Sequence, residues 1–178
     1  MTHQTQAEFA LEAGAEVSSR PAVLTGRRDR LTRLDRRTLH APEAMCEAYR
    51  YSKPSAFSRG MEVDLGTATL VFVSGTASVG PSGETLHAWD FRAQAWQAFE
   101  NARAVLKDAG ADWHDVVKTT IFLKDIATYY AAFNEVRCAY FKKMGFDVYP
   151  ASTCVQAKLC RDRLLVEMEL IAVVRNSY

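Results

Sequence analysis

Two glutamates stand inside the apolar run LLVEMELIAVV, residues 164–174. This run has the composition of a buried strand, where a carboxylate without partners is costly. Side chains alternate along a strand, so Glu167 and Glu169 share one face and lie about 7 Å apart. A carboxylate in this setting is either hydrogen-bonded and structural, or retained because a shifted pKa serves proton transfer. Periodicity supports both interpretations equally.

The polar stretch YPASTCVQ comes just before this run and has the pattern of a second strand. If residues 160–163 form a four-residue hairpin loop, Gln156 lies opposite Glu167. Two residues further along, Cys154 then lies opposite Glu169. The predicted polar patch has five members: Ser152, Cys154, Gln156, Glu167 and Glu169. For Cys154 a core-filling role is the more common one, because no histidine lies nearby in the sequence to generate a thiolate.

Length and composition indicate one compact domain with an extension. The 178 residues, 48% of them hydrophobic, suffice for a sizeable core. With 22 basic and 21 acidic side chains, the net charge of +1 favours neither nucleic acid nor membrane as a partner, so small molecules are expected. The N-terminus lacks a signal-peptide pattern, and no apolar run reaches the roughly 18 residues of a membrane span. The four cysteines lack metal-ligand spacing, so we expect reduced thiols, a cytoplasmic location and no metal.

The N-terminal part of the chain differs in composition from the rest. Between Arg20 and Arg37 there are seven arginines and two aspartates, with little apolar periodicity. One interpretation is an electrostatic arm for nucleic acid or an acidic partner, but the run lacks stacking aromatic residues. A solvated arm, or a short helix packed on a neighbouring subunit, is the favoured interpretation. We therefore predict an Arg-rich extension over residues 1–48 and a folded domain over 49–178.

Regular patterns begin near Tyr51. They predict a pair of strands within 61–74, a helix from 90 to 110, a strand over 116–123, a helix from 125 to 145, and two final strands within 149–174. The order ββαβαββ predicts an α+β fold, a mixed sheet with both helices on one face. The other face is still largely apolar, so we expect a homo-oligomer whose sheets pack face to face or enclose a barrel.

Five blocks of sequence carry a resemblance to a known family: LVFVSGTASVG, NARAVLKDAGADWHDVVKTTIFLKDI, FNEVRCAYF, YPASTCV and VEMELIAVV. In this order, over about seven tenths of the chain, they resemble the RidA (YjgF) family. The resemblance implies a chorismate-mutase-like ββαβαββ fold and a trimeric, barrel-like assembly. It also implies small-molecule sites in the clefts between subunits.

The resemblance further implies an activity. In members that hydrolyse reactive enamines and imines to ketones and ammonia, the first glutamate of the VExE strand positions or activates water, and Glu167 matches it. Those members read PAR[ST] before the cysteine, and the arginine binds a substrate carboxylate. This chain reads PAST, with Ser152 in place of the arginine. Arg59, Arg161 and Arg163 are candidates for a substitute charge.

The stretches KPSAFSRGMEV, SGTASVG and HAWDFRAQ are similar to the chorismatase branch of the same superfamily. We therefore predict a cofactor-free acid–base enzyme of specialised biosynthesis, a tautomerase, cyclase or hydrolase acting on a conjugated imine, enamine or carbonyl compound. The alternatives are an imine deaminase of the usual kind and a non-catalytic small-molecule-binding protein, with RNA cleavage least favoured. Glu167 is the candidate catalytic residue. The candidate substrate-binding residues are Phe57, Arg59, Gly75, Thr76, Trp89, Tyr149, Ser152 and Cys154.

Overall fold

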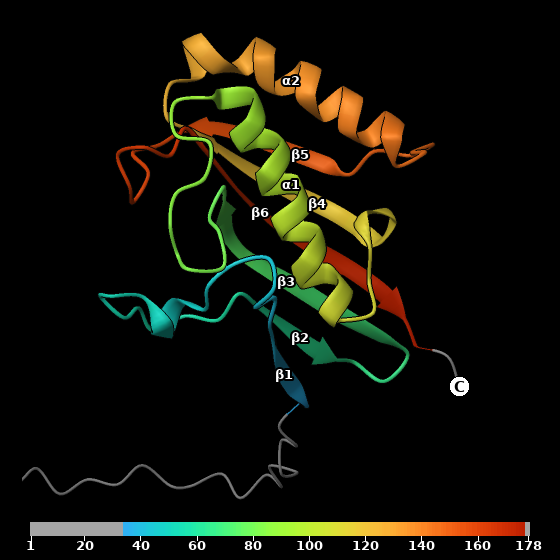
Figure 1. Cartoon of the computed structure of the whole chain (residues 1–178). Coiled ribbons are helices and arrows are strands. Elements are labelled where there is room, and N and C mark those ends of the chain that lie inside the picture. The colour runs from blue at the N-terminus through green and yellow to red at the C-terminus, as the bar shows by residue number, and fades with distance from the viewer. Residues whose placement is uncertain (1–33, 177–178) are drawn as a thin grey trace, which may run out of the picture. The chain divides into compact units, whose positions relative to one another are not determined.

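Strand β6 (Val166–Arg175) lies in the interior of a six-stranded sheet with the order β1-β2-β3-β6-β4-β5 (Figure 1). The structure is a computed structural model that describes residues 34–176. The other strands are β1 (Arg36–Leu39), β2 (Gly60–Asp64), β3 (Ala68–Ala77), β4 (Val116–Leu123) and β5 (Ala151–Gln156). Neighbouring strands are antiparallel except β4 and β5, which are parallel. The sheet is therefore mixed, as predicted.

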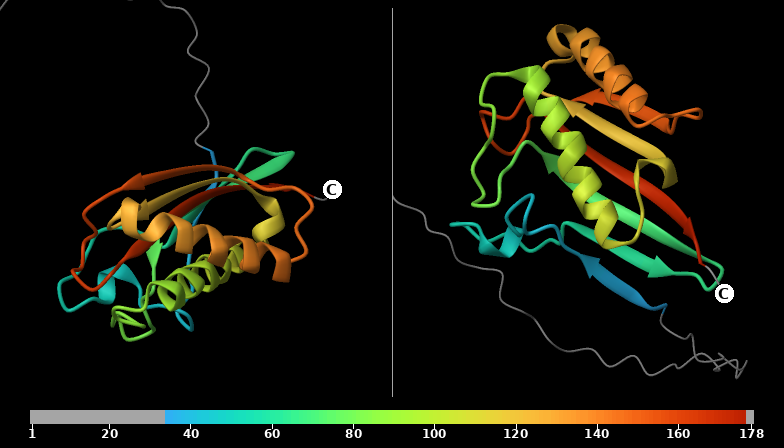
Figure 2. Two further views of the ribbon diagram at one scale, coloured as in Figure 1. Left: turned by 90° about the horizontal axis from the view of Figure 1, so that it is seen from above. Right: turned by 45° about the vertical axis from the view of Figure 1, so that its right-hand side comes forward.

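Helices α1 (Phe91–Asp108) and α2 (Ile126–Lys143) both lie on one face of this sheet (Figure 2). The order from β2 to β6 confirms the predicted ββαβαββ arrangement and the α+β class. Two short 3-10 helices, η1 (Ala48–Arg50) and η2 (Trp113–Asp115), lie in the connections. Within the described residues, no helix is both long enough and apolar enough to cross a bilayer.

Both long helices begin and end at the residues that the sequence indicates. Asp90 and Asp125 are the N-caps, and each side chain accepts a hydrogen bond from the backbone N–H three residues later, at 3.0 Å. These bonds satisfy one of the free N–H groups of the first turn. Gly110 and Gly145 follow the helix ends with φ angles of +69° and +71°. Glycine takes this left-handed conformation without the steric cost of a Cβ.

Two buried polar side chains of α1 fix the backbone around the ends of two central strands. Asn101 donates through Nδ2 to the Ala77 carbonyl at 2.9 Å, at the end of β3. Gln94 donates through Nε2 to the Arg163 carbonyl at 2.8 Å and accepts from the Leu165 N–H at 2.9 Å, just before β6. Both side chains are fully buried, where an unmade hydrogen bond would be costly. Helix α1 therefore holds β3 and the entry to β6 in fixed positions.

The sheet face away from the helices remains apolar in part. Phe72, Val155 and Val173 are 39%, 38% and 38% exposed, one on each of β3, β5 and β6. On β6, Glu167 and Glu169 point to this open face. The residues that alternate with them, Val166, Met168 and Leu170, are buried under the helices. The prediction that the two glutamates share a face is confirmed. An apolar face of this kind is typical of a contact surface between proteins.

The predicted start of the folded domain at residue 49 is wrong. Residues 34–48, the part of the predicted extension that the structure describes, contribute to the sheet and the core. Strand β1 pairs with β2, and Leu39, Met45 and Ala48 are at most 1% exposed in the core. The sequence does not show an alternating strand pattern here, because β1 has only four residues and only the last of them is buried. The Arg-rich segment before residue 34 lies outside the described residues.

The predicted hairpin between the last two strands is also wrong. Strand β5 pairs only with β4, in parallel, so β4 separates β5 from β6. Ser152 and Cys154 lie beside Thr119 and Ile121 on the helix side of the sheet. The predicted polar patch therefore does not form within one chain.

Leu39→Ala should lower the free energy of unfolding by about 2–5 kcal/mol, since it removes a fully buried side chain that packs beside Gly60 and Val105. The matched control is Leu34→Ala, which removes a side chain that is 56% exposed and should change stability by less than about 0.5 kcal/mol. Denaturant unfolding at one protein concentration measures both. Equal stability of the two variants would show that β1 is not part of the core.

Candidate active site

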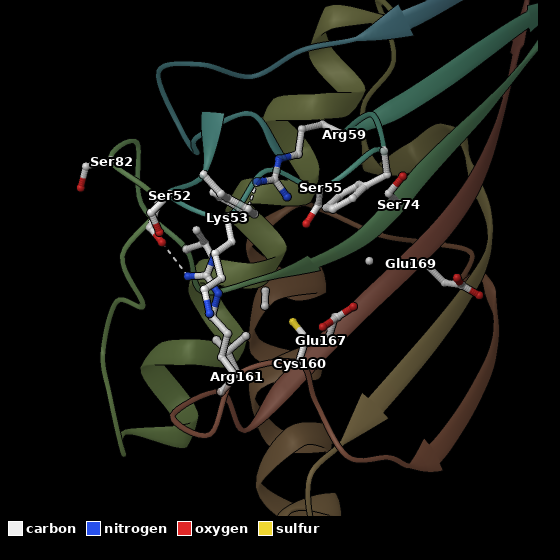
Figure 3. A pocket seen from close by; sticks show the side chains of 17 residues that line it. Ser52, Lys53, Ser55, Arg59, Ser74, Ser82, Cys160, Arg161, Glu167 and Glu169 are labelled. Carbon is white, nitrogen blue, oxygen red and sulfur yellow. Dashed lines mark hydrogen bonds between the residues drawn. The ribbon is translucent and has the colours of Figure 1, made fainter. Parts of the chain in front are cut away.

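An open cavity of about 920 Å³ lies against the uncovered side of β3 and β6 (Figure 3). Its walls come from the loop before β2, the bulged part of β3, the loop after β3, the loop before β6, and β6 itself. The residues that line it include Tyr51, Lys53, Phe57, Arg59, Ser74, Gly75, Gly83, Cys160, Arg161, Glu167 and Glu169. Segments far apart in the sequence thus meet around the carboxylates of Glu167 and Glu169.

Glu167 is half-buried in the wall of this cavity. Burial raises the pKa of its carboxyl group, because the charged form loses hydration. The negative charge of Glu169 raises this pKa further, and the positive charge of Arg59 acts in the opposite direction. A carboxyl group with a raised pKa can both hold and release a proton closer to neutral pH, which suits general acid–base chemistry.

Gly75 makes room for the Glu167 carboxylate. The pairing of β3 with β6 shifts between Val73 and Thr76, so Ser74 and Gly75 together oppose one residue of β6. A Cβ added at Gly75 would lie 3.1 Å from Cδ of Glu167 and closer still to its Oε1 atom. A larger residue at this position would therefore displace the carboxylate.

Arg59 forms part of the cavity wall but is held by its own neighbours. It is 3% exposed, and its Nε donates to the Cys46 carbonyl at 3.0 Å. A second guanidinium nitrogen donates to the same carbonyl and to the Tyr51 hydroxyl. The guanidinium also lies 5.3 Å and 5.4 Å from the ring centroids of Tyr51 and Phe57. Arg59 therefore supplies a fixed positive charge near Glu167.

Of the nine residues predicted from the sequence, the structure brings four together in this cavity: Phe57, Arg59, Gly75 and Glu167. Thr76 is buried and donates to the Ser74 carbonyl at 2.7 Å, so it supports the bulge. Trp89 is 68% exposed and is not among the lining residues. Cys154 packs partly against the core, where burial raises the pKa of its thiol and disfavours the thiolate.

Tyr149 and Ser152 line a separate groove of about 210 Å³ between α2 and β5. Arg137 of α2 reaches into this groove and donates through Nη1 to the Ser152 hydroxyl at 3.2 Å. A guanidinium group therefore lies beside position 152, although the residue at that position is serine. This contact cannot be inferred from local sequence patterns, because Arg137 and Ser152 are 15 residues apart and lie on different elements.

The fold and the cavity together define a small α+β protein with a half-buried carboxylate in the wall of a cavity that is large enough for a small molecule. Residues 51–174 match the family model described as Endoribonuclease L-PSP, so the chain belongs to this family, which includes the RidA and YjgF proteins. The predicted membership of the RidA (YjgF) family is confirmed. The similarity to chorismatases stays a prediction.

Among curated proteins, the 2-iminobutanoate/2-iminopropanoate deaminase of Salmonella typhimurium is 40% identical over 114 residues, 64% of this chain and 84% of that protein. Among solved structures, the YjgF gene product of Escherichia coli is 31% identical, with a TM-score of 0.62 over 79% of this chain and 99% of that one. E. coli TdcF, solved with bound serine, is 30% identical, with a TM-score of 0.63 over the same shares. These similarities agree with the fold described above.

Gly75→Ala should lower the free energy of unfolding by about 1–3 kcal/mol, because its methyl group overlaps the Glu167 carboxylate. The same substitution in a Glu167→Ala background should be neutral or slightly stabilising, since the obstacle is gone and alanine restricts the unfolded chain. Denaturant unfolding of the four proteins measures this coupling. Equal effects of Gly75→Ala in both backgrounds would show that Gly75 is needed for the backbone conformation and not to make room for the carboxylate.

Proposed function

We propose that this protein hydrolyses small imines and enamines to ketones and ammonia, with Glu167 as the proton-transferring group. The observation that carries the proposal is the half-buried Glu167 carboxylate, with its raised pKa, in the wall of an open cavity. The relatives named 2-iminobutanoate/2-iminopropanoate deaminase support the same reaction.

The reaction needs one group that moves protons in both directions. An enamine first takes a proton on carbon and loses one from nitrogen, and so becomes the imine. Glu167 then accepts a proton from water as the water oxygen bonds to the C=N carbon, and it passes this proton to the nitrogen to give the carbinolamine. In the last step Glu167 takes the hydroxyl proton and gives a proton to the amino group, so that the C–N bond breaks, ammonia leaves and the C=O bond forms. Imine and water thus give ketone and ammonia, and the carboxyl group returns to its starting state.

The same proton transfer, without the addition of water, would serve a biosynthetic tautomerase or cyclase. The curated relatives carry deaminase names, so they support hydrolysis more than this specialised reaction. The family description also names an endoribonuclease. A net charge of +1 gives no electrostatic basis for strong RNA binding.

We further propose that the working form is a cytoplasmic homotrimer. Association would cover the exposed Phe72, Val155 and Val173 of the sheet face that the helices leave open. It would also close the mouth of the Glu167 cavity, which one chain leaves open to solvent. The four cysteines are free thiols, as is usual for cytoplasmic proteins.

Glu167→Gln should lower the rate of ammonia release from freshly generated 2-iminobutanoate by about a hundredfold or more, the usual scale for a general acid–base group. Glu169→Gln is the matched control, because this residue lies on the same strand and lines the same cavity but is more exposed. It should retain most of the activity. Full activity of a correctly folded Glu167→Gln protein would leave a non-catalytic binding role as the better explanation for the cavity.

Light scattering at micromolar concentration should report about three times the chain mass of 19.9 kDa. Phe72→Lys places a charge on the exposed sheet face and should shift the particle towards the monomer, whereas Tyr130→Lys, at a 47% exposed position on α2, should not. A wild-type monomer at this concentration would contradict the proposed assembly.

A further inference from the structure

Arg161 is the cation that is best placed to bind a substrate in the Glu167 cavity. It belongs to the loop between β5 and β6 and lines the cavity with Lys53 and Glu167. Its Nη1 donates to the Gly83 carbonyl at 2.6 Å, and its guanidinium lies 4.9 Å from the centroid of the Tyr51 ring. Figure 3 shows the Arg161 and Lys53 side chains on one side of the cavity and the Glu167 carboxylate on the other. The backbone and ring contacts hold Arg161 in place.

The other two candidate arginines are less suitable. Arg59 is fixed by the Cys46 carbonyl and the Tyr51 hydroxyl, so most of its donors already have partners. Arg163 is exposed and does not line the cavity. Among residues 34–176, neither Arg161 nor Lys53 forms an ion pair. A hydrogen bond from Ser82 and, more weakly, the charge of Arg161 lower the pKa of the exposed Glu84 carboxyl group. Arg161 and Glu84 form no ion pair, however, so both cations can still bind a ligand.

We propose that Arg161, with Lys53 beside it, binds the carboxylate of the substrate while Glu167 acts at the imine carbon. The guanidinium has five N–H donors, and its contact with Gly83 uses one of them. The remaining donors can form a charge-assisted pair with a carboxylate, which is among the stronger hydrogen-bonded interactions in proteins. The reaction that follows binding is taken from the proposed function. The binding of a carboxylate by Arg161 does not depend on it.

Tyr51 acts as a positioning residue for this charge. Its ring lies under Arg161 at 4.9 Å and under Arg59 at 5.3 Å, and its hydroxyl accepts a hydrogen bond from Arg59. One aromatic ring thus supports both guanidinium groups of the cavity. Without the ring, Arg161 would keep its charge and lose part of its fixed orientation.

Calorimetric titration with 2-oxobutanoate tests the site independently of turnover, since this keto acid carries the carboxylate and is stable. Arg161→Gln should weaken its binding about 10- to 100-fold, the scale of a hydrogen bond to a charged group. In the rate assay with 2-iminobutanoate it should raise KM with little change in kcat. Arg163→Gln is the matched control two residues away and should change neither. Tyr51→Leu should weaken binding less than Arg161→Gln does, and binding of neutral 2-butanone should be the same in all variants.

Arg161→Lys keeps the charge without the forked donors and should bind with intermediate affinity, which tests the role even if Arg161→Gln folds poorly. Unchanged 2-oxobutanoate binding in a folded Arg161→Gln protein would overturn the inference, as would a wild type that does not bind the keto acid. A loss confined to Arg137→Gln would overturn it too and would place the carboxylate in the groove at Ser152. Binding that depends on Arg161, in a protein that releases no ammonia from imines, would support the anchor and contradict the proposed reaction.

Discussion

The two-residue period of β6 is the constraint on which the rest of the structure depends. This strand lies between β3 and β4, and one of its faces is buried under the helices with Val166 and Met168 fully covered. A shift of register by one residue would bring Glu167 and Glu169 into the core in place of Val166 and Met168, so the register is strongly fixed. The position of Glu167 is thereby determined by the hydrophobic core on the opposite face. The cavity is built around a residue whose backbone cannot shift along the sheet without disrupting the core.

This arrangement has a cost in stability that depends on pH. The pKa of Glu167 is raised in the folded protein, so the folded chain keeps its proton at pH values where the unfolded chain has already released it. This pH range begins near the ordinary glutamate pKa and ends near the raised pKa of the folded protein. Across it, the contribution of Glu167 to the free energy of unfolding falls as pH rises. The bulge at Gly75 and the charge of Arg59 limit the cost by making space for the carboxylate and by favouring its charged form.

The sequence predicted the elements with strong periodicity and failed where pairing decides the structure. The helices capped by Asp90 and Asp125, and the shared face of the two glutamates, follow from local patterns. Strand β1 was missed because it is short and mostly exposed, and β5 was paired with the wrong neighbour because nothing local distinguishes a hairpin from a parallel partner. For the same reason Ser152 was placed beside Glu167. The hydrogen bond of Arg161 to Gly83 joins residues 78 positions apart, which no spacing rule could connect.

The two residues to which we assign roles in the cavity, Glu167 and Arg161, differ in how accurately each must be placed. A general base must lie within hydrogen-bond reach of the proton that it takes, so a central strand with a fixed register is a suitable support for Glu167. A carboxylate anchor needs charged N–H donors that face the ligand, and these can come from any segment beside the site. In this chain Ser152 replaces the arginine that the family motif would supply, while Arg137 lies beside Ser152 and Arg161 lies in the Glu167 cavity. Under the proposed function, absence of the motif arginine is compatible with the presence of Glu167, because the proposed anchor can lie on a loop whereas the proposed proton-transferring group needs a fixed position on the strand.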